Sequence, residues 1–389
     1  MTLDFNLLRR QYRSLLVDGW VPFWFRHGID WEHGGVLSSM SEDGKVLSGD
    51  KYIWSQARSV WTFSALYNRV ERRPEFLEAA ENSLRFLLAH GRDEQGRWVY
   101  RTDRAGKVLE GATSIYSDCF AVYGLSEYCR AVENPRLLQL ALDTHASILE
   151  RVERPEFRET APYVIPEGRR IHAVPMILTE VTNELALTTG LPGLEAVADR
   201  CADQVMNRFL WAERGLLLEY LDRDYHRLPP PEGTAVVPGH AIESMWFVLH
   251  VARRRADLVL ARRAAQAIRW HLEAGWDPDY GGIFLGIDAE GRAPFVPNAE
   301  KKLWWPHTEA LYALLLAWHL TGERWCMDWY EKVHEWSFAH FPMPECGEWR
   351  QRLTRAGEPT TELVALPVKD PFHLPRAAML ITQLLGQCR

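Results

Sequence analysis

The sequence predicts an all-α protein in which six helical hairpins close into a toroid, an (α/α)6 barrel with short β-hairpin loops. Three observations predict this fold: apolar residues recur at helical spacing, alternating strand patterns are few, and a glycine-containing loop returns at regular intervals. Because repetitive helical folds use a chain of this length as one unit, we expect residues 1–389 to form a single domain.

Two stretches show the helical periodicity most clearly. In residues 76–88 the apolar side chains fall on one face after Pro74, a residue that fits the first turn of a helix. In residues 137–149 they do the same after Asn134 and Pro135. The spacing therefore predicts an amphipathic helix at each place.

Between the helices a loop pattern recurs: acidic residues, one or two glycines, a short aromatic or apolar segment, and then Asp or Arg, one further residue and Gly. It occurs as WEHGGVLSSMSEDGK from Trp31, DEQGRWVYRTDRAGK from Asp93, ERGLLLEYLDRDYHR from Glu213, DYGGIFLGIDAEGR from Asp279 and ECGEWRQRLTRAGE from Glu345. The marker glycines Gly35, Gly96, Gly215, Gly282 and Gly347 are 61, 119, 67 and 65 residues apart. The long step is close to two periods, and a degenerate copy near Pro162 to Gly168 makes six.

Each period has room for two helices and a hairpin-like loop, which is the basis for six hairpins in a ring. A ring of this kind places one set of loops around a central pocket, and we expect the chemistry there. The repeated glycines are interpreted as structural, because they supply turns with positive φ.

Composition and charge exclude several classes of protein. The chain is 47% apolar and 25% charged with a formal net charge of −7, and it has no Lys/Arg run of the kind that binds nucleic acid. Its six cysteines form no CxxC pair, which argues against a zinc ribbon or a compact disulfide framework. The N-terminus lacks a signal-peptide pattern, and no apolar run approaches the roughly 20 residues that span a bilayer. We therefore expect a soluble, cytoplasmic protein with no nucleic-acid or membrane partner.

Four segments concentrate polar and aromatic side chains: KYIWSQARSVWTF, PGHAIESMWF, KKLWWPHTEALYALL and VKDPFHLPRA. Their candidate site residues are Trp54, Arg58, His240, Glu243, Trp246, Lys302, Trp305, His307, Glu309 and His373. Each of these residues also has a purely structural interpretation. A lone histidine is more often a hydrogen-bonded structural residue, and most tryptophans fill the core. Arg58 fits a structural ion pair as well as it fits a contact with a sugar oxygen.

Histidine and glutamate together suggest proton transfer. Removing a proton next to a carbonyl needs a base with a pKa near neutrality, and returning it to the opposite face needs a second such group. His240 and His373 meet that requirement. A helical His240-x-x-Glu243 spacing also fits a metal site, and two carboxylates such as Glu243 and Glu309 fit a glycoside hydrolase, although the histidines would then have no task. A non-catalytic sugar-binding protein is the remaining alternative.

The motifs WSQARSVW, SIYSDCF, AVPMIL, PGHAIE, KLWW-x-H-x-E and FHLPR occur in this order between Trp31 and Arg376. In this the chain resembles the N-acylglucosamine 2-epimerase superfamily, which includes cellobiose 2-epimerases and mannose isomerases. The resemblance implies an (α/α)6 barrel that interconverts free sugars through an open chain and an enediol-like intermediate, as a homodimer in many relatives.

The resemblance also implies roles for individual residues. His240 and His373 would exchange the C2 proton, Arg58 would steady a substrate oxygen, and Glu243 and Glu309 would orient the histidines or assist ring opening. The implied substrate-binding residues are Trp54, Met176, Trp246, Lys302, Trp305 and His307. No metal and no cofactor are required in this interpretation.

Two features bear on the substrate. Met176 occupies a segment where mannose isomerases and cellobiose epimerases tend to carry another histidine, which favours epimerisation of N-acetylglucosamine and N-acetylmannosamine. However, ATP-activated members of that branch carry a Gly-Gly-Lys-x-Lys-Gly-like segment before the last histidine, where this chain reads LVALPVKDP from Leu363. That departure argues against ATP as an allosteric activator, and it keeps open an ATP-independent epimerase or aldose–ketose isomerase acting on mannose, glucose or fructose.

Overall fold

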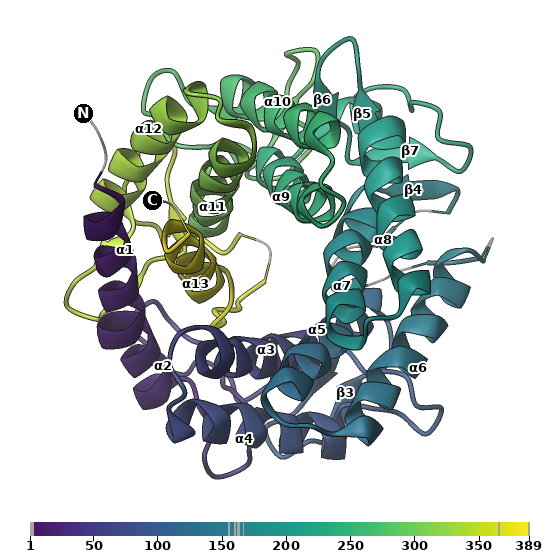
Figure 1. Ribbon diagram of the computed structural model, residues 1–389, viewed down its shortest axis with the longest axis vertical. Coiled ribbons are helices and arrows are strands. Elements are labelled where there is room, and N and C mark those ends of the chain that lie inside the picture. Colours follow the sequence, from purple (N-terminus) through teal and green to yellow (C-terminus); the bar gives the residue numbers. More distant parts are fainter. Residues whose placement is uncertain are drawn as a thin grey trace.

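Six helices form the inner wall of a closed ring in the computed structural model (Figure 1). The structure describes residues 4–154, 156–158, 161, 164–165, 167–364 and 366–387. The inner helices are α3 (Ile53–Arg69), α5 (Ile115–Ala131), α7 (Ala173–Thr189), α9 (Pro238–Arg254), α11 (Trp304–Thr321) and α13 (His373–Leu385). Each packs against the next, and α13 closes the ring against α3.

A second layer of helices surrounds this wall and completes the (α/α)6 barrel that the sequence predicts. Its members are α1 (Phe5–Ser14), α4 (Pro74–His90), α6 (Pro135–Val152), α8 (Pro192–Gln204), α10 (Leu258–Gly275) and α12 (Trp325–His340). The π-helical segment η1 (Leu15–Trp20) and α2 (Val21–His27) continue α1. Because α1 packs against α13, the sixth helix pair is made by the two ends of the chain.

Inner and outer helices differ in the pattern of buried residues along their sequences. Outer helix α6 buries only one stripe, which includes Ala141, Thr144, His145 and Ile148. Inner helix α11 is buried all round from Pro306 to Ala317, so it shows no amphipathic period. The clear periodicity at 76–88 and 137–149 therefore marked two outer helices, while inner helix α11 gave no comparable signal.

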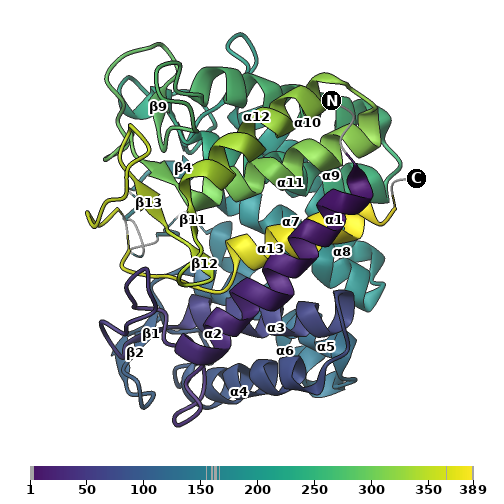
Figure 2. The ribbon, with the colours of Figure 1, turned by 90° about the vertical axis from the view of Figure 1, so that its left-hand side faces the viewer.

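Every connection from an outer to an inner helix is long, and these loops gather at one end of the barrel, on the left in Figure 2. Gly168 lies in the loop between α6 and α7 with φ +76°, as the predicted degenerate copy requires; Pro162 lies outside the described residues. Connections from inner to outer helices, such as residues 132–134 and 190–191, are short. This asymmetry produces the repeat of about 65 residues.

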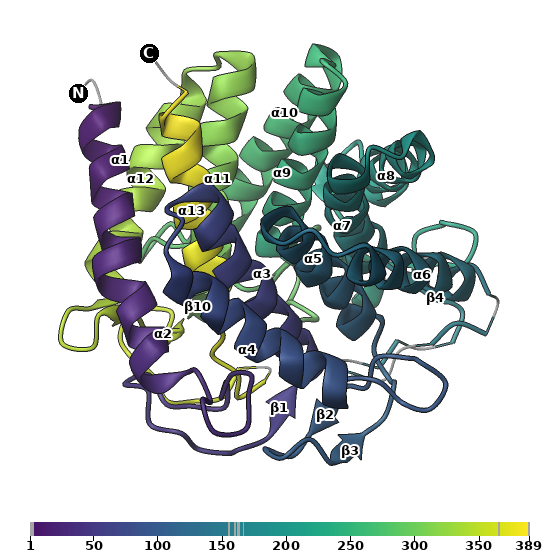
Figure 3. The same cartoon turned by 60° about the horizontal axis from the view of Figure 1, so that its bottom comes forward.

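Short antiparallel strands tie the loops together, and most of them pair a loop with its neighbour. The sheet β1 (Lys51–Tyr52), β2 (Arg101–Thr102), β3 (Val108–Glu110) lies below α3 in Figure 3. The pairs are β4 (Arg169–Ile171) with β7 (Tyr220–Asp222), β5 (Leu210–Trp211) with β6 (Leu216–Leu217), β8 (Ala235–Val236) with β9 (Ile287–Asp288), β10 (Lys302–Leu303) with β13 (Arg352–Leu353), and β11 (Pro342–Met343) with β12 (Glu348–Trp349). Two further short turns of helix are η2 (Val205–Phe209) and η3 (Glu232–Thr234).

A buried ion pair fixes the loop that precedes α11. The Lys302 ammonium donates to Asp277 Oδ2 at 3.0 Å, and both side chains are fully buried. Arg355 from the next loop donates to the same oxygen at 2.9 Å. Burial alone would raise the pKa of Asp277, but Arg355 and Lys302 together hold it well below its usual range. The Asp277 carboxylate thus joins two neighbouring loops.

None of the helices in the described part of the chain is long and apolar enough to cross a membrane.

Replacing Lys302 by Met should destabilise the barrel by about 3 kcal/mol, because removing one partner of a buried pair leaves the other charge poorly compensated. The measurement is the free energy of unfolding in urea. Arg269→Ala is the matched control: it breaks an exposed pair with Glu273, and we expect a change of no more than about 0.5 kcal/mol. Equal effects of the two substitutions would contradict the structural role of Lys302.

Candidate active site

The inner helices all begin at the loop end of the barrel, so their first turns face one another there. The first two turns of α9 carry His240 and Glu243, α11 carries Trp305 and Glu309, and α13 begins at His373. Helix N-termini carry partial positive charge, which favours a developing anion. The fold therefore brings most of the predicted catalytic residues to one place.

Arg376 links three inner helices at this point. Its Nη2 donates to Glu243 Oε1 at 2.5 Å and to Glu309 Oε1 at 2.8 Å, and all three side chains are buried. In the sequence Arg376 stands out only as part of the FHLPR motif. Its position three residues after His373, on the same helical face, was the available signal.

His373 is held by the same network. Its Nδ1 lies 2.7 Å from Glu309 Oε1, and the indole N–H of Trp246 donates to Glu309 Oε2 at 2.7 Å. Burial and the nearby charge of Arg58 lower the pKa of His373 to about 3. A neutral imidazole that donates from Nδ1 leaves Nε2 as an acceptor, so His373 can act as a base.

His240 has a different partner, which the sequence did not reveal. Its Nδ1 lies 3.1 Å from Oε2 of Glu219, a buried residue on the loop between β6 and β7. Glu219 Oε1 lies 3.6 Å from Nδ1 of His172, and His172 Nε2 is hydrogen bonded to Ser244 at 2.8 Å. Glu219 sits in an apolar stretch, LLLEYL, where only its charge marks it.

The electrostatic surroundings of His240 oppose those of His373. Burial would lower the pKa of His240, but the Glu219 carboxylate more than offsets this by its charge and hydrogen bond, so the pKa is raised. Below that pKa the ring carries a proton, and its Nδ1–H is directed to Glu219. His240 is therefore suited to donate a proton from Nε2.

Trp305 and Arg58 complete the group. The Trp305 ring packs against both histidines, with centroid distances of 5.3 Å to His240 and 5.8 Å to His373. Arg58 donates to Asp370 at 3.0 Å, and its guanidinium stacks on Trp54. Arg58 thus forms the structural ion pair, and its buried Nε has no hydrogen-bond partner among the described residues.

The family model described as N-acylglucosamine 2-epimerase (GlcNAc 2-epimerase) matches residues 35–376. The chain belongs to this family. N-acylglucosamine 2-epimerase of Bos taurus is 32% identical over 381 residues, covering 95% of this chain and 89% of that protein. The Homo sapiens protein of the same name is 31% identical over 384 residues, covering 95% and 88%.

Solved structures agree on the fold. The cellobiose 2-epimerase from Bacillus thermoamylovorans superposes with a TM-score of 0.84 at 19% identity, covering 97% of this chain and 99% of that one. The relatives are named epimerases and isomerases, and the chain is an isomerase-type enzyme of this family.

The structure commits two of the predicted substrate-binding residues of this epimerase-family protein, His307 and Lys302, to contacts within the protein. His307 is fully buried: its Nδ1 donates to the Leu303 carbonyl, and its Nε2 accepts the amide of Ile283 at 2.9 Å. With both ring nitrogens bound to backbone and the ring stacked on Trp336 of α12, His307 holds a loop in place. Lys302 is committed to Asp277 in the same way.

Two other predicted contact residues lie beside the site, in buried positions. Trp246 is fully buried and acts on Glu309 through its indole N–H, so it positions a carboxylate and presents no face to a sugar. Met176 is buried in the first turn of α7, on the helix that carries Glu180.

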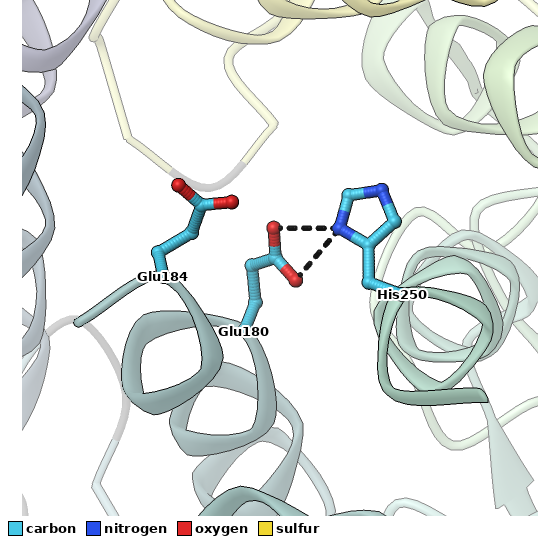
Figure 4. Close-up of side chains that lie close together, drawn as sticks. All are labelled: Glu180, Glu184 and His250. Atoms are coloured by element: carbon cyan, nitrogen blue, oxygen red, sulfur yellow. Dashed lines mark hydrogen bonds and ion pairs between the residues drawn. The ribbon is translucent and has the colours of Figure 1, made fainter. Parts of the chain in front are cut away.

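Further along the barrel axis lies a second polar cluster (Figure 4). Both carboxylate oxygens of Glu180 lie within 3.1 Å of His250 Nδ1, and His250 Nε2 is hydrogen bonded to Tyr312 at 2.7 Å. Glu184 instead pairs with Arg130 at 2.7 Å and with Arg69 at 3.1 Å. These charges pair among themselves, and the ring of His250 packs against Trp246, so the cluster supports the site from behind.

Two groups in the described residues have three ligand atoms close enough to hold a metal ion: Glu243, Glu309 and His373, and the cluster of Figure 4. In the first group the Arg376 guanidinium already lies between the two carboxylates, where a cation would sit. In the second, two arginines contact Glu184. Both donor sets are therefore neutralised by the protein's own cations.

Substituting Gln for Glu219 should lower the pKa of His240, because the amide keeps hydrogen-bonding capacity but removes the negative charge that raises it. Histidine NMR signals followed against pH give the measurement, with His240→Asn used to assign the resonance. Glu290→Gln, on another loop, is the control and should leave the titration unchanged. An unaltered His240 titration in Glu219→Gln would show that Glu219 does not set its charge.

Proposed function

We propose that the protein interconverts N-acetylglucosamine and N-acetylmannosamine: one of the two histidines, His373 or His240, removes the C2 proton, and the other delivers a proton to the opposite face of C2. The observation that carries the proposal is the histidine pair: both rings pack against Trp305, each has its own carboxylate, and their pKa values are shifted in opposite directions. The relatives named N-acylglucosamine 2-epimerase support the substrate class.

The chemistry follows from these protonation states. With an open-chain sugar bound, neutral His373 takes the C2 proton at Nε2, and the C2–H electron pair forms the C1=C2 bond while O1 becomes an oxyanion. Protonated His240 then returns a proton to C2 on the opposite face, and the C1 carbonyl is restored. The reverse reaction uses the same groups with their roles exchanged.

Arg58 is suited to stabilise the enediolate. It is a permanently charged group near His373, and its Nε–H is unpaired within the described residues. Asp370 and the rings of Trp54, Phe120 and Phe372 fix its orientation, so little reorganisation is needed when charge develops. The N-termini of the inner helices add to the same field.

The substrate assay separates the two sugar classes. Proton NMR in D2O with N-acetylmannosamine, N-acetylglucosamine, mannose, glucose and fructose in separate tubes should show loss of the C2 proton and conversion only with the N-acetyl sugars. Turnover of the plain hexoses alone would replace this proposal by the isomerase alternative.

The hydrolase alternative has less support. Glycosidases need one carboxyl of their pair to donate a proton and the other to act as base or nucleophile. Here Glu243 and Glu309 both accept from one buried guanidinium, that of Arg376, and Glu309 also binds His373 and Trp246. Both carboxylates are thus used to neutralise and orient other groups.

Three expectations from the sequence stay predictions: a cytoplasmic location, a homodimer, and catalysis without ATP. The segment that stands where ATP-activated relatives carry lysines and glycines has one lysine, Lys369. Its ammonium is buried and binds Glu348 and the Trp349 carbonyl at 2.5 and 2.6 Å. That lysine is not available to a phosphate, which supports independence from ATP.

Single-histidine variants should separate exchange from epimerisation. His240→Asn and His373→Asn are expected to epimerise about 10²- to 10⁴-fold more slowly. In D2O each should still exchange the C2 proton of one epimer, and the two variants should act on opposite epimers, because one base remains on one face. His226→Asn, on an exposed loop, is the control. Near-normal turnover in both catalytic variants would reject the two-histidine mechanism.

Turnover should persist in EDTA and should not respond to ATP. The reason is that Arg376 supplies the positive charge between Glu243 and Glu309, and Lys369 is occupied. Initial rates are measured after dialysis against chelator, with dialysis in plain buffer as the control. A loss that Mn²⁺ or Zn²⁺ restores would establish a metal requirement and contradict this interpretation.

A further inference from the structure

One turn conformation recurs in the loops, and one copy has a tyrosine where other copies have glycine. In this turn the amide of the fourth residue donates to the carbonyl of the first, as in Gly106 to Asp103. The fourth residue has positive φ in each copy and is a glycine at Gly44, Gly96, Gly106, Gly291 and Gly357. In the turn Asp222–His226 that position is Tyr225, with φ +65°.

A tyrosine in this conformation is strained, because its Cβ crowds the backbone where glycine has none. Strained conformations persist where the surrounding structure holds them, and they cluster at ligand sites. The Tyr225 ring packs edge-on against Phe209 and lies under the guanidinium of Arg170 at 4.5 Å. Its hydroxyl has no hydrogen-bond partner within the described residues, so the fold gives the phenol no task of its own.

Tyr225 lines a cavity of about 310 Å³ on the outer side of the barrel wall. The cavity lies between α6, α7, α8 and the β4–β7 ladder, on the right in Figure 1, and Phe157 and Phe209 contribute further aromatic surface. Its volume is at the small end of the range for ligand sites, which suits a single sugar ring. α7 separates it from the histidine pair, since Val174 and Leu178 line the cavity.

The cavity has an excess of positive charge. Five arginines line it against two acidic residues, Glu153 and Asp224. Arg154 and Arg169 are paired with Glu150 and Glu232. The other three, Arg170, Arg200 and Arg223, form no ion pair among the described residues.

Arginines without a carboxylate partner, beside an aromatic face, have the chemistry that recognises an anionic sugar. The guanidinium fork binds a phosphate or carboxylate, and the phenol ring offers an apolar face to a pyranose. We propose that this cavity is a second ligand site, for a monosaccharide that carries a phosphate or a carboxylate, with Tyr225 as its stacking platform and Arg170, Arg200 and Arg223 as its anion-binding groups.

The site is connected to the catalytic group, a step that rests on the proposed function. Arg170 lies in β4, and Tyr225 is in the turn that follows β7. The same ladder continues to the next pair of residues, where the amide of His172 donates to the carbonyl of Glu219, the residue that holds His240. A ligand that draws Arg170 and Tyr225 together therefore acts on the backbone that positions His240.

Calorimetric titration of the full-length protein at low ionic strength tests the site directly, with glucose 6-phosphate and glucuronate as probes. Glucose and inorganic phosphate, each alone, separate the contributions of ring and anion. Arg170→Gln and Tyr225→Gly should weaken binding at least about tenfold, the loss expected for one charge-assisted contact. Gly fits the backbone at position 225, so this variant should fold as well as the parent. Arg262→Gln, on exposed α10, is the matched control.

The proposal is supported if either anionic sugar binds the parent and binding is lost in the two cavity variants. Binding must also be kept in Arg262→Gln and in the active-site variant Arg58→Gln. It is overturned if neither anionic sugar binds, if the cavity variants bind normally, or if inorganic phosphate binds as tightly as the sugar. A separate rate measurement tests the coupling: the bound sugar should alter turnover in the parent but not in Tyr225→Gly. Binding without an effect on turnover would reject only the coupling.

Discussion

The buried guanidinium of Arg376 is the constraint on which the site depends. A charge removed from water must be paired, and here the partners come from two other inner helices, Glu243 on α9 and Glu309 on α11. Satisfying Arg376 therefore sets how α13 sits between its neighbours. Because Glu309 also accepts from His373, the pairing that compensates the buried arginine also fixes the orientation of the proposed catalytic base. Stability and catalysis share one set of contacts at the point where the ring closes.

The repeats show how one loop design supports both structural and chemical residues. Gln56 and His307 occupy equivalent positions near the starts of α3 and α11, and both bind the backbone of the preceding loop, at Val36 and Ile283. Lys51 and Lys302 likewise pair with Asp30 and Asp277. Two residues after His307, on the opposite face of α11, Glu309 meets Arg376. The face of the inner helix on which a side chain lies, more than its residue type, decides whether it binds the preceding loop or points to the barrel centre near Arg376.

This explains what could be predicted from the sequence. The repeat revealed the hairpins, since the glycines that its turns require recur at fixed spacing. His240, His373, Glu243 and Glu309 were predictable because charged groups in otherwise apolar helices are costly without a purpose. His307 has the same appearance in sequence but binds loop backbone, a difference that the sequence does not reveal because helix faces cannot be told apart when a helix is buried all round. Glu219 and Asp370 were missed since their partners lie 21 and 312 residues away, on contacts that only the folded barrel creates.

The two histidines also differ in access to water, and this bears on how the catalyst is reset. In the proposed mechanism, one turnover leaves a proton on His373 and removes one from His240, which is the reverse of the resting state. The His240 side chain is 30% exposed, whereas that of His373 is 10% exposed. His240 can therefore regain a proton from solvent directly, while His373 must release its proton through the emptied site, helped by burial and by the charge of Arg58, which disfavour its protonated form. The electrostatic asymmetry that prepares the forward step thus also drives the return to the resting state.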